Sequence, residues 1–343
     1  MRNAKLAWMI VLGALAPIVS GLPAQAQGTW VKKYDAKRVA EVHVVSKQLL
    51  VAVAEDSILA SPDGGATWHV LLTEPNAQLR DLFLFDAQSG WAVGHPGVVL
   101  QLKPSAPGGT GPGAGRLQAE GVGETDFYTV FFRNPTTGWI GGAGGRLMTT
   151  QDGGLTWTTQ TFQLPQGDSD TDTAIHAVLF LTDQNGVAML GGKAVVYSED
   201  GGKQWRSLGF PANVSLDALT HTGQTLWLAG GRRLTPTLTV GMLWRSDDYG
   251  KTWKTVPVGD LYGAVTSVWF ADGTTGFIAV KGKLYSTQDG GATWTEASDG
   301  SVAIEKVFGA DAHTLWGLAG GAIYHYTTGA APTPPPASSN GGR

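Results

Sequence analysis

The stretch SPDGGATW at residues 61–68 decides the fold, because the chain repeats it with small changes. The other copies are TQDGGLTW at 150–157, SEDGGKQW at 198–205, SDDYGKTW at 246–253 and TQDGGATW at 287–294. Successive copies start 89, 48, 48 and 41 residues apart, and the first interval is close to two periods. Internal repetition at periods of roughly 20 to 50 residues indicates a repeat architecture in which one copy has decayed.

Each octapeptide has the chemistry of a tight hairpin. The Asp carboxylate can accept hydrogen bonds from turn N–H groups, the glycines supply positive φ, and the Trp enters the next strand and packs on the turn. This pattern is the Asp-box, or BNR repeat, which sialidases, other glycosidases and non-catalytic propellers share, so it specifies fold better than function. The predicted structural residues are Asp63, Trp68, Asp152, Trp157, Asp200, Trp205, Asp248, Trp253, Asp289 and Trp294.

A second pattern lies between the boxes: an apolar strand, a polar turn, then Gly-Trp or its equivalent and a glycine-rich strand. Clear copies begin at Leu79, Phe127, Ile175 and Val265, and weaker copies begin near Val39, Leu216 and Ile304. These seven units are spaced about 40 to 48 residues apart, a length that suits one four-stranded blade. We therefore predict an all-β, seven-bladed β-propeller.

The two ends of the repeat region predict how the ring closes. The last unit, residues 304–328, has neither an Asp-box nor a closing strand. Residues 28–30, Gly-Thr-Trp, reproduce the tail of an Asp-box and lead into a strand-like segment that ends at Tyr34. Because an unclosed propeller leaves exposed sheet edges, we expect this N-terminal strand to complete the seventh blade.

The termini carry segments of other kinds. Arg2 and Lys5 precede an apolar run at residues 6–19 and a small-residue Ala-Gln-Ala site, a pattern typical of a secretory signal peptide over residues 1–26. A membrane anchor is the alternative, but the run is short and contains Pro17. Residues 27–328 form the predicted propeller, and the Pro-, Ser- and Gly-rich residues 329–343 are expected to be a disordered tail.

Composition narrows the classes of function. The formal net charge is −4 and falls further without the leader, which argues against a nucleic-acid partner. The absence of cysteine excludes disulfides, thiolate catalysis, cysteine metal sites and lipid attachment. The seven histidines show no metal-ligand spacing, so we predict no metal and no cofactor. We expect an exported monomer without a membrane span after processing, located in the periplasm, or in the thylakoid lumen of a photosynthetic organism.

Three insertions interrupt the regular repeat, and such departures are good pointers to function. Residues 103–116 replace the Asp-box of unit two and are interpreted as a loop. Residues 163–173 carry Asp168, Asp170 and Asp172; a solvated acidic loop is favoured over a calcium loop, because the loop glycine and the twelfth-position Glu are missing. Residues 230–241 form an expanded loop in unit five that contains Arg232 and Arg233.

Alignment of the innermost strands predicts a ring of residues near the channel mouth, on the face opposite the Asp-boxes. These residues are Ala40, Arg80, Tyr128, His176, Asp217, Thr266 and Glu305. Polar side chains at a water-filled mouth need no function, but the ring is a plausible binding surface. Arg232 and Arg233 are expected on the same face, where paired guanidinium groups suit carboxylates.

A glycosidase or sialidase is the alternative function. Residues 132–135, Phe-Arg-Asn-Pro, resemble a sialidase signature, but Arg133 falls in a turn on the Asp-box face and follows the first box instead of preceding it. A glycosidase needs a carboxylate pair across a cleft, and Asp217 with Glu305 is the pair that the alignment offers.

The pairing of the two repeats resembles the photosystem II stability and assembly factor family over about residues 28–328. The clearest matches are Gly-Trp-Ala-Val-Gly at 90–94, Gly-Trp-Ile-Gly-Gly at 138–142, and the boxes at Asp152 and Asp289. The resemblance implies a non-catalytic assembly factor that binds a client protein, such as a membrane-protein precursor or a membrane complex. It also implies an arginine cluster, which matches loosely to Arg80, Arg232, Arg233 and Arg245, so the expected client-binding residues are these four with Tyr128 and His176.

Overall fold

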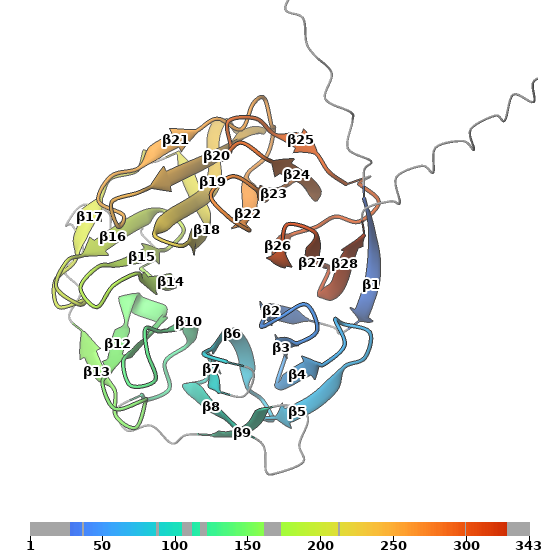
Figure 1. Cartoon of the computed structure of the whole chain (residues 1–343). Coiled ribbons are helices and arrows are strands. Elements are labelled where there is room, and N and C mark those ends of the chain that lie inside the picture. The colour runs from blue at the N-terminus through green and yellow to red at the C-terminus, as the bar shows by residue number, and fades with distance from the viewer. Residues whose placement is uncertain are drawn as a thin grey trace, which may run out of the picture.

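The computed structural model describes residues 28–35, 38–86, 89–104, 112–116, 122–160, 173–211, 213–298 and 300–327. Within these ranges the chain forms seven four-stranded sheets, arranged as blades around a central channel (Figure 1). The single described helix is the three-residue 3-10 turn η1 (Ala143–Gly145). Among the described residues, no helix is long and apolar enough to cross a membrane. The fold is all-β and seven-bladed, which confirms the prediction from the repeats.

In six blades the strands run in sequence order from the channel to the rim. The first three of these blades are β2 (Val39–Val44), β3 (Leu50–Ala54), β4 (Ser57–Ser61) and β5 (His69–Thr73); β6 (Gln78–Leu84), β7 (Gly90–His95), β8 (Val98–Pro104) and β9 (Pro112–Arg116); and β10 (Phe127–Phe132), β11 (Gly138–Gly142), β12 (Leu147–Thr150) and β13 (Thr158–Gln160).

The next three blades follow the same order around the ring. They are β14 (Ile175–Phe180), β15 (Gly186–Leu190), β16 (Ala194–Ser198) and β17 (Arg206–Leu208); β18 (Val214–Thr222), β19 (Thr225–Thr235), β20 (Leu238–Ser246) and β21 (Lys254–Val256); and β22 (Val265–Phe270), β23 (Gly276–Val280), β24 (Lys283–Thr287) and β25 (Thr295–Glu296).

The seventh blade joins the two ends of the repeat region. It contains β26 (Lys306–Asp311), β27 (Thr314–Ala319) and β28 (Ala322–Thr327), and its outermost strand is β1 (Thr29–Asp35). Strand β1 pairs antiparallel with β28, from Thr29 opposite Thr327 to Asp35 opposite Ala322 (Figure 1). Trp30 is buried and its ring centroid lies 5.0 Å from that of Tyr326. The N-terminal strand therefore closes the ring, as predicted.

The Asp-boxes hold their hairpins by the hydrogen bonds that the sequence predicts. In the first box, Asp63 accepts the Thr67 N–H at 2.8 Å and the Thr67 hydroxyl at 2.6 Å. The Gly65 N–H donates to the Ser61 hydroxyl at 2.7 Å, and the Ser61 hydroxyl donates to Asp63. The Thr67 hydroxyl and N–H, which favour the carboxylate, lower the pKa of Asp63 to about 2.

The tryptophans of the repeats also hold neighbouring blades together. Trp139 of the third blade stacks on Phe180 of the fourth at 3.7 Å between ring centroids, and the box residue Trp205 contacts the same Phe180 ring edge-on at 5.7 Å. The same triplet recurs at two other boundaries, as Trp91, Phe132, Trp157 and as Trp227, Phe270, Trp294. Offset and edge-on aromatic contacts of this kind add stability beyond the buried area.

The box glycines belong to this boundary as well as to the turn. Gly154 has φ +82°, and a Cβ at this position would lie 2.4 Å from the Trp91 ring of the preceding blade. The residue must therefore be glycine for two reasons, backbone conformation and space. Each Asp-box packs against the blade before it.

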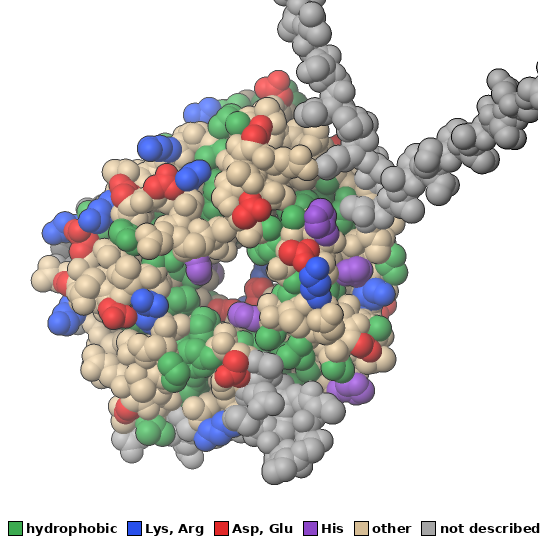
Figure 2. Space-filling view, in the orientation of Figure 1, with side chains coloured by type: hydrophobic (Ala, Val, Ile, Leu, Met, Phe, Trp, Pro, Cys, Tyr) green, Lys and Arg blue, Asp and Glu red, His purple; other side chains and the backbone are tan. Residues whose placement is uncertain are grey.

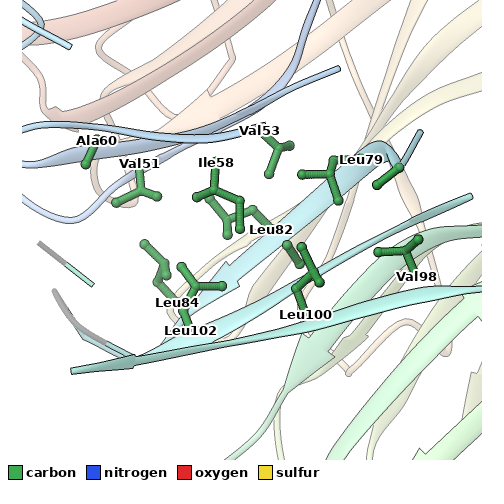
Figure 3. Close-up of a cluster of buried hydrophobic side chains, with 12 residues drawn as sticks. Val51, Val53, Ile58, Ala60, Leu79, Leu82, Leu84, Val98, Leu100 and Leu102 are labelled. Atoms are coloured by element: carbon green, nitrogen blue, oxygen red, sulfur yellow. The ribbon is translucent and has the colours of Figure 1, made fainter. Parts of the chain in front are cut away.

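The hydrophobic core is divided among the blade boundaries. Figure 3 shows the cluster between the first two blades, in which Val51 and Ile58 of one sheet face Leu82 and Leu100 of the next. All four side chains are at most 4% exposed. Because neighbouring blades cover both faces of each sheet, second strands such as β3, β11, β15 and β23 are buried along their whole length, whereas outermost strands such as β13 and β17 are polar and exposed.

The interpretation of residues 103–116 as a loop was wrong in part. Residues 112–116 form β9, which pairs with β8 from Leu100 opposite Arg116 to Pro104 opposite Pro112. Without β9, the backbone N–H and C=O groups on the outer edge of β8 would have no hydrogen-bond partners. A glycine-rich segment can supply these partners although it contains no Asp-box. The second blade thus keeps four strands although its Asp-box is lost.

Candidate binding surface at the channel mouth

A β-bulge interrupts the innermost strand of six blades at the same place. At each bulge one residue has no partner in the register of the first and second strands. These residues are Ala40, Arg80, Tyr128, His176, Asp217 and Thr266. Bulges re-aim the side chain that they carry. The structure therefore places the aligned residues at one level of the ring. The seventh, Glu305, lies just before β26, where its N–H donates to the Leu318 carbonyl at 2.8 Å.

A cavity of about 980 Å³ occupies the channel mouth beside these bulges. Arg80, Tyr128, His176 and Asp217 line it, together with Lys306 of the seventh blade. The turns that contain Asp56 and Gly192 also reach it, which fixes it on the face opposite the Asp-boxes. The space-filling view shows an opening through the middle of the ring, bordered by hydrophobic, histidine and acidic side chains (Figure 2).

Arg80, Tyr128 and His176 form a stack across three consecutive blades. The Arg80 guanidinium carbon lies 5.2 Å from the centre of the Tyr128 ring, and the Tyr128 and His176 rings stack at 5.2 Å with 19° between their planes. The Arg80 Nε–H is buried and has no hydrogen-bond partner among the described residues. A guanidinium that is stacked on one face can still donate from its edge, so Arg80 is prepared for an acceptor such as a carboxylate.

Three charged residues that the sequence analysis did not select lie just inside the mouth. Lys306 donates to Glu41 at 2.8 Å and to the Ala40 carbonyl at 3.1 Å. Asp81 accepts the N–H groups of Leu82 and of Val130 in the next blade, both at 2.8 Å. Burial in the channel wall, with the nearby Glu41 charge, raises the pKa of Asp81 to about 7 although both N–H groups and Lys306 oppose this.

The raised pKa of Asp81 predicts a pH-dependent stability. Between about pH 4 and pH 7 the folded chain binds more protons at Asp81 than the unfolded chain does, so the free energy of unfolding falls as the pH rises. The variant Asp81→Asn has no ionisable carboxyl group at this position, so this contribution to the pH dependence is absent from it. Between pH 5 and pH 8, the unfolding free energy of the parent is expected to fall by on the order of 1 to 3 kcal/mol relative to that of Asp81→Asn. Urea titrations measure this shift, and a pH-independent difference would contradict it.

The two carboxylates considered for the glycosidase alternative, Asp217 and Glu305, do not line the same cavity. Asp217 lines the cavity, and desolvation raises its pKa. Glu305 lies outside the lining of this cavity as the structure describes it, and its carboxylate accepts the Gly320 N–H at 3.3 Å. Arg133 lies in the turn after β10, where its Nε is 3.4 Å from a carboxylate oxygen of Asp183 in the next blade. The resemblance of residues 132–135 to a sialidase signature thus lies away from the cavity, as expected.

The fifth blade carries an arm on the same face as the cavity. Strand β19 has eleven residues, whereas the equivalent β23 has five, and residues 232–237 are exposed without interruption. Leu228 packs toward the fourth blade and Ala229 toward the sixth. By strand alternation, Arg232 points to the first side and Arg233 to the second. The two guanidinium groups therefore leave the strand on opposite sides, and whether the pair anchors an acidic segment of a client stays a prediction.

Arg245 is not part of the mouth. It precedes the Asp-box at the other end of β20, where its Nε donates to Asp247 at 2.8 Å and its guanidinium lies 5.6 Å from the Trp227 ring centre. The predicted acidic loop with Asp168, Asp170 and Asp172 lies outside the described residues, as do the predicted signal peptide and the predicted C-terminal tail. Within the described ranges, no group of three or more His, Asp or Glu side chains could hold a metal ion.

Comparisons with known proteins agree with the repeat pattern. A family model described as photosynthesis system II assembly factor YCF48 matches residues 119–214 and 167–326. No curated protein sequence matches the chain.

Among solved structures, YCF48 from Cyanidioschyzon merolae is 18% identical with a TM-score of 0.66, and the match covers 88% of this chain and 99% of that one. A structure of YCF48 bound to D1 peptide is 16% identical, with 91% and 100% coverage and a TM-score of 0.66. The GH74 enzyme of Niastella koreensis is 16% identical, with 88% and 52% coverage and a TM-score of 0.61. At these identities the structural likeness shows the fold.

Proposed function

Because the chain belongs to the photosynthesis system II assembly factor YCF48 family, we propose that it is a non-enzymatic scaffold that binds a segment of a client protein at the channel mouth. The observation that carries this proposal is the Arg80, Tyr128 and His176 stack beside the cavity. It combines a charged donor edge with two stacked aromatic rings. These features suit an extended peptide that carries a carboxylate and an apolar or planar side chain.

Residues of opposite charge lie on different parts of the cavity wall, and this arrangement favours one orientation of such a peptide. Arg80 stands on one part of the wall, whereas Asp217 of the fifth blade and the turn containing Asp56 supply acidic groups on other parts. A carboxylate is expected to approach Arg80, and a basic side chain or an N–H group is expected to face the acids. One YCF48 structure contains a bound D1 peptide, which supports a peptide segment as the class of client.

The signal peptide that the sequence predicts at residues 1–26 supports placing this binding outside the cytoplasm, in the periplasm or in a thylakoid lumen. There the scaffold would meet client segments that emerge from the membrane. The chain acts as a monomer in this proposal, since one ring contains the complete stack and cavity.

Peptide binding tests the proposal. A fluorescently labelled D1 peptide with a free C-terminal carboxylate is the probe, and anisotropy gives its Kd. Arg80→Ala is expected to weaken binding about 10- to 100-fold, because a hydrogen bond to a charged group contributes roughly 1.5–3 kcal/mol. Tyr128→Ala is expected to weaken it about 10-fold through the lost stacking surface.

The matched control is Thr266→Ala, at the equivalent bulge of a blade that does not line the cavity; its Kd should stay within about twofold. Equal affinities for the parent, Arg80→Ala and Tyr128→Ala would rule out this site. Failure of the parent to bind would reject D1-like peptides as the client class. Turnover of fluorogenic glycosides that disappears in Asp217→Asn would instead favour the glycosidase alternative.

A further inference from the structure

The distal part of the fifth blade, residues 232–239 with the loop 261–263, forms a rigid arm. On one edge, the Arg233 N–H donates to the Asn213 carbonyl at 2.8 Å and the Asn213 amide donates to the Arg233 carbonyl at 2.9 Å. On the other edge, Gly241 donates to Leu261 at 3.0 Å and Gly263 donates to Thr239 at 2.8 Å. With both edges hydrogen-bonded, the hairpin projects without being a flexible loop.

The arm presents cations and apolar side chains together. Leu234 is 48% exposed and Tyr262 is 57% exposed, two of the five large hydrophobic residues that are exposed in the described chain. Arg232 and Arg233 are exposed, and within the described residues no ion pair engages either one. Lys281 of the sixth blade is a further exposed cation next to Gly263.

The geometry of the arm selects among anionic partners. Arg232 lies in register with Val240 and Tyr262, and Arg233 lies in register with Thr239 on the other side of the sheet. Two guanidinium groups that diverge from one strand cannot both bind one carboxylate. They can both reach a flat anionic surface that meets the tip end-on, while Leu234 and Tyr262 enter its apolar boundary.

We propose that this arm docks on a membrane surface that contains anionic lipid headgroups. The chain as a whole is acidic, with a formal net charge of −4, so an anionic surface repels most of the molecule and attracts the arm. This difference orients the ring. Because the arm and the cavity share one face, docking places the cavity toward the membrane. The proposal does not depend on the identity of the client.

The absence of cysteine allows a site-specific test on the full chain. A single Thr237→Cys variant, labelled with a polarity-sensitive fluorophore, reports on the tip of the arm. Leu155→Cys, an exposed Asp-box position on the opposite face, is the matched reporter. With vesicles of phosphatidylcholine and phosphatidylglycerol, the label at 237 is expected to shift to the blue and the label at 155 is not. Vesicles of phosphatidylcholine alone should shift neither label.

Charge removal in the Thr237→Cys background tests the chemistry. Arg232→Gln with Arg233→Gln is expected to weaken vesicle binding about 30-fold, because each basic residue near an anionic surface contributes about 1 kcal/mol. Lys203→Gln with Lys254→Gln removes the same charge from exposed positions on the Asp-box face and should leave binding within about twofold.

Two results would overturn the proposal. In the first, the labels at 237 and 155 respond alike, or the arginine pair proves dispensable. In the second, the arginine pair is required for binding a tetraglutamate peptide but not for binding vesicles, which would assign the arm to an acidic protein segment. Since the vesicle measurement contains no client peptide and the peptide measurement contains no vesicles, failure of this proposal and failure of the peptide site are distinguishable.

Discussion

Removal of residues 28–34 is expected to lower the melting temperature of the chain by more than about 10 °C and to broaden the transition. The deletion takes away the outer strand of the seventh blade and the buried Trp30 side chain, and it exposes the edge of β28. Truncation of a buried Trp alone costs about 3–5 kcal/mol. Every blade depends on two neighbours, so the loss at one boundary weakens the entire ring.

Thermal unfolding followed by circular dichroism measures this effect. Trp30→Ala should show about half of it or more, and Lys32→Ala, an exposed position on the same strand, should stay near the parent. A synthetic peptide of residues 27–36 is expected to restore part of the lost stability to the deletion variant. A deletion variant that melts with the parent would show that β1 does not close the ring.

Trp139→Ala is expected to lower the free energy of unfolding by about 3–5 kcal/mol, the usual cost of truncating a buried aromatic side chain. Trp139 is 2% exposed, and its ring stacks 3.7 Å from Phe180 of the next blade. The substitution leaves a cavity at a blade boundary and removes the surface on which the next Asp-box turn rests, because Gly202 lies against the Trp139 indole.

Urea unfolding gives the value for Trp139→Ala. Trp139→Phe retains part of the stack and should cost less than half as much, while Leu155→Ala, 61% exposed, should change stability by less than about 0.5 kcal/mol. A cost below 1 kcal/mol for Trp139→Ala would mean that the interblade stacks contribute little and that the boundary is held by the aliphatic clusters.

The fold was predictable from the sequence because its determinants are local. An Asp-box such as that at Asp63 makes its hydrogen bonds within a few residues, so the octapeptide sequence is sufficient to predict the hairpin. Strand β9 was missed for the opposite reason: its pairing depends on the free edge of β8 and not on its own proline- and glycine-rich residues. The closing strand was found only because residues 28–30 keep the tail of a lost box.

The candidate site was predictable in outline and not in its electrostatics. Alignment placed Arg80, Tyr128 and His176 at one level, since each occupies the same bulge in its own repeat. The contact of Lys306 with Glu41 joins residues 265 apart in sequence, and no repeat pattern reports on such a pair. The divergence of the two arginines of the arm follows from strand alternation, once the sequence is known to be strand there.

The closure of the ring by β1 also constrains the order in which the chain folds. Thr29 and Thr327 are 298 residues apart, yet their hydroxyls are hydrogen-bonded at 3.2 Å. During synthesis the first strand of the propeller is therefore made first and obtains its partner last. Contacts of such long separation form slowly, because the intervening chain must be ordered beforehand. Until residue 327 has been synthesised, six blades can assemble along the chain. The ring stays open during this time, because β1 has not yet paired with β28.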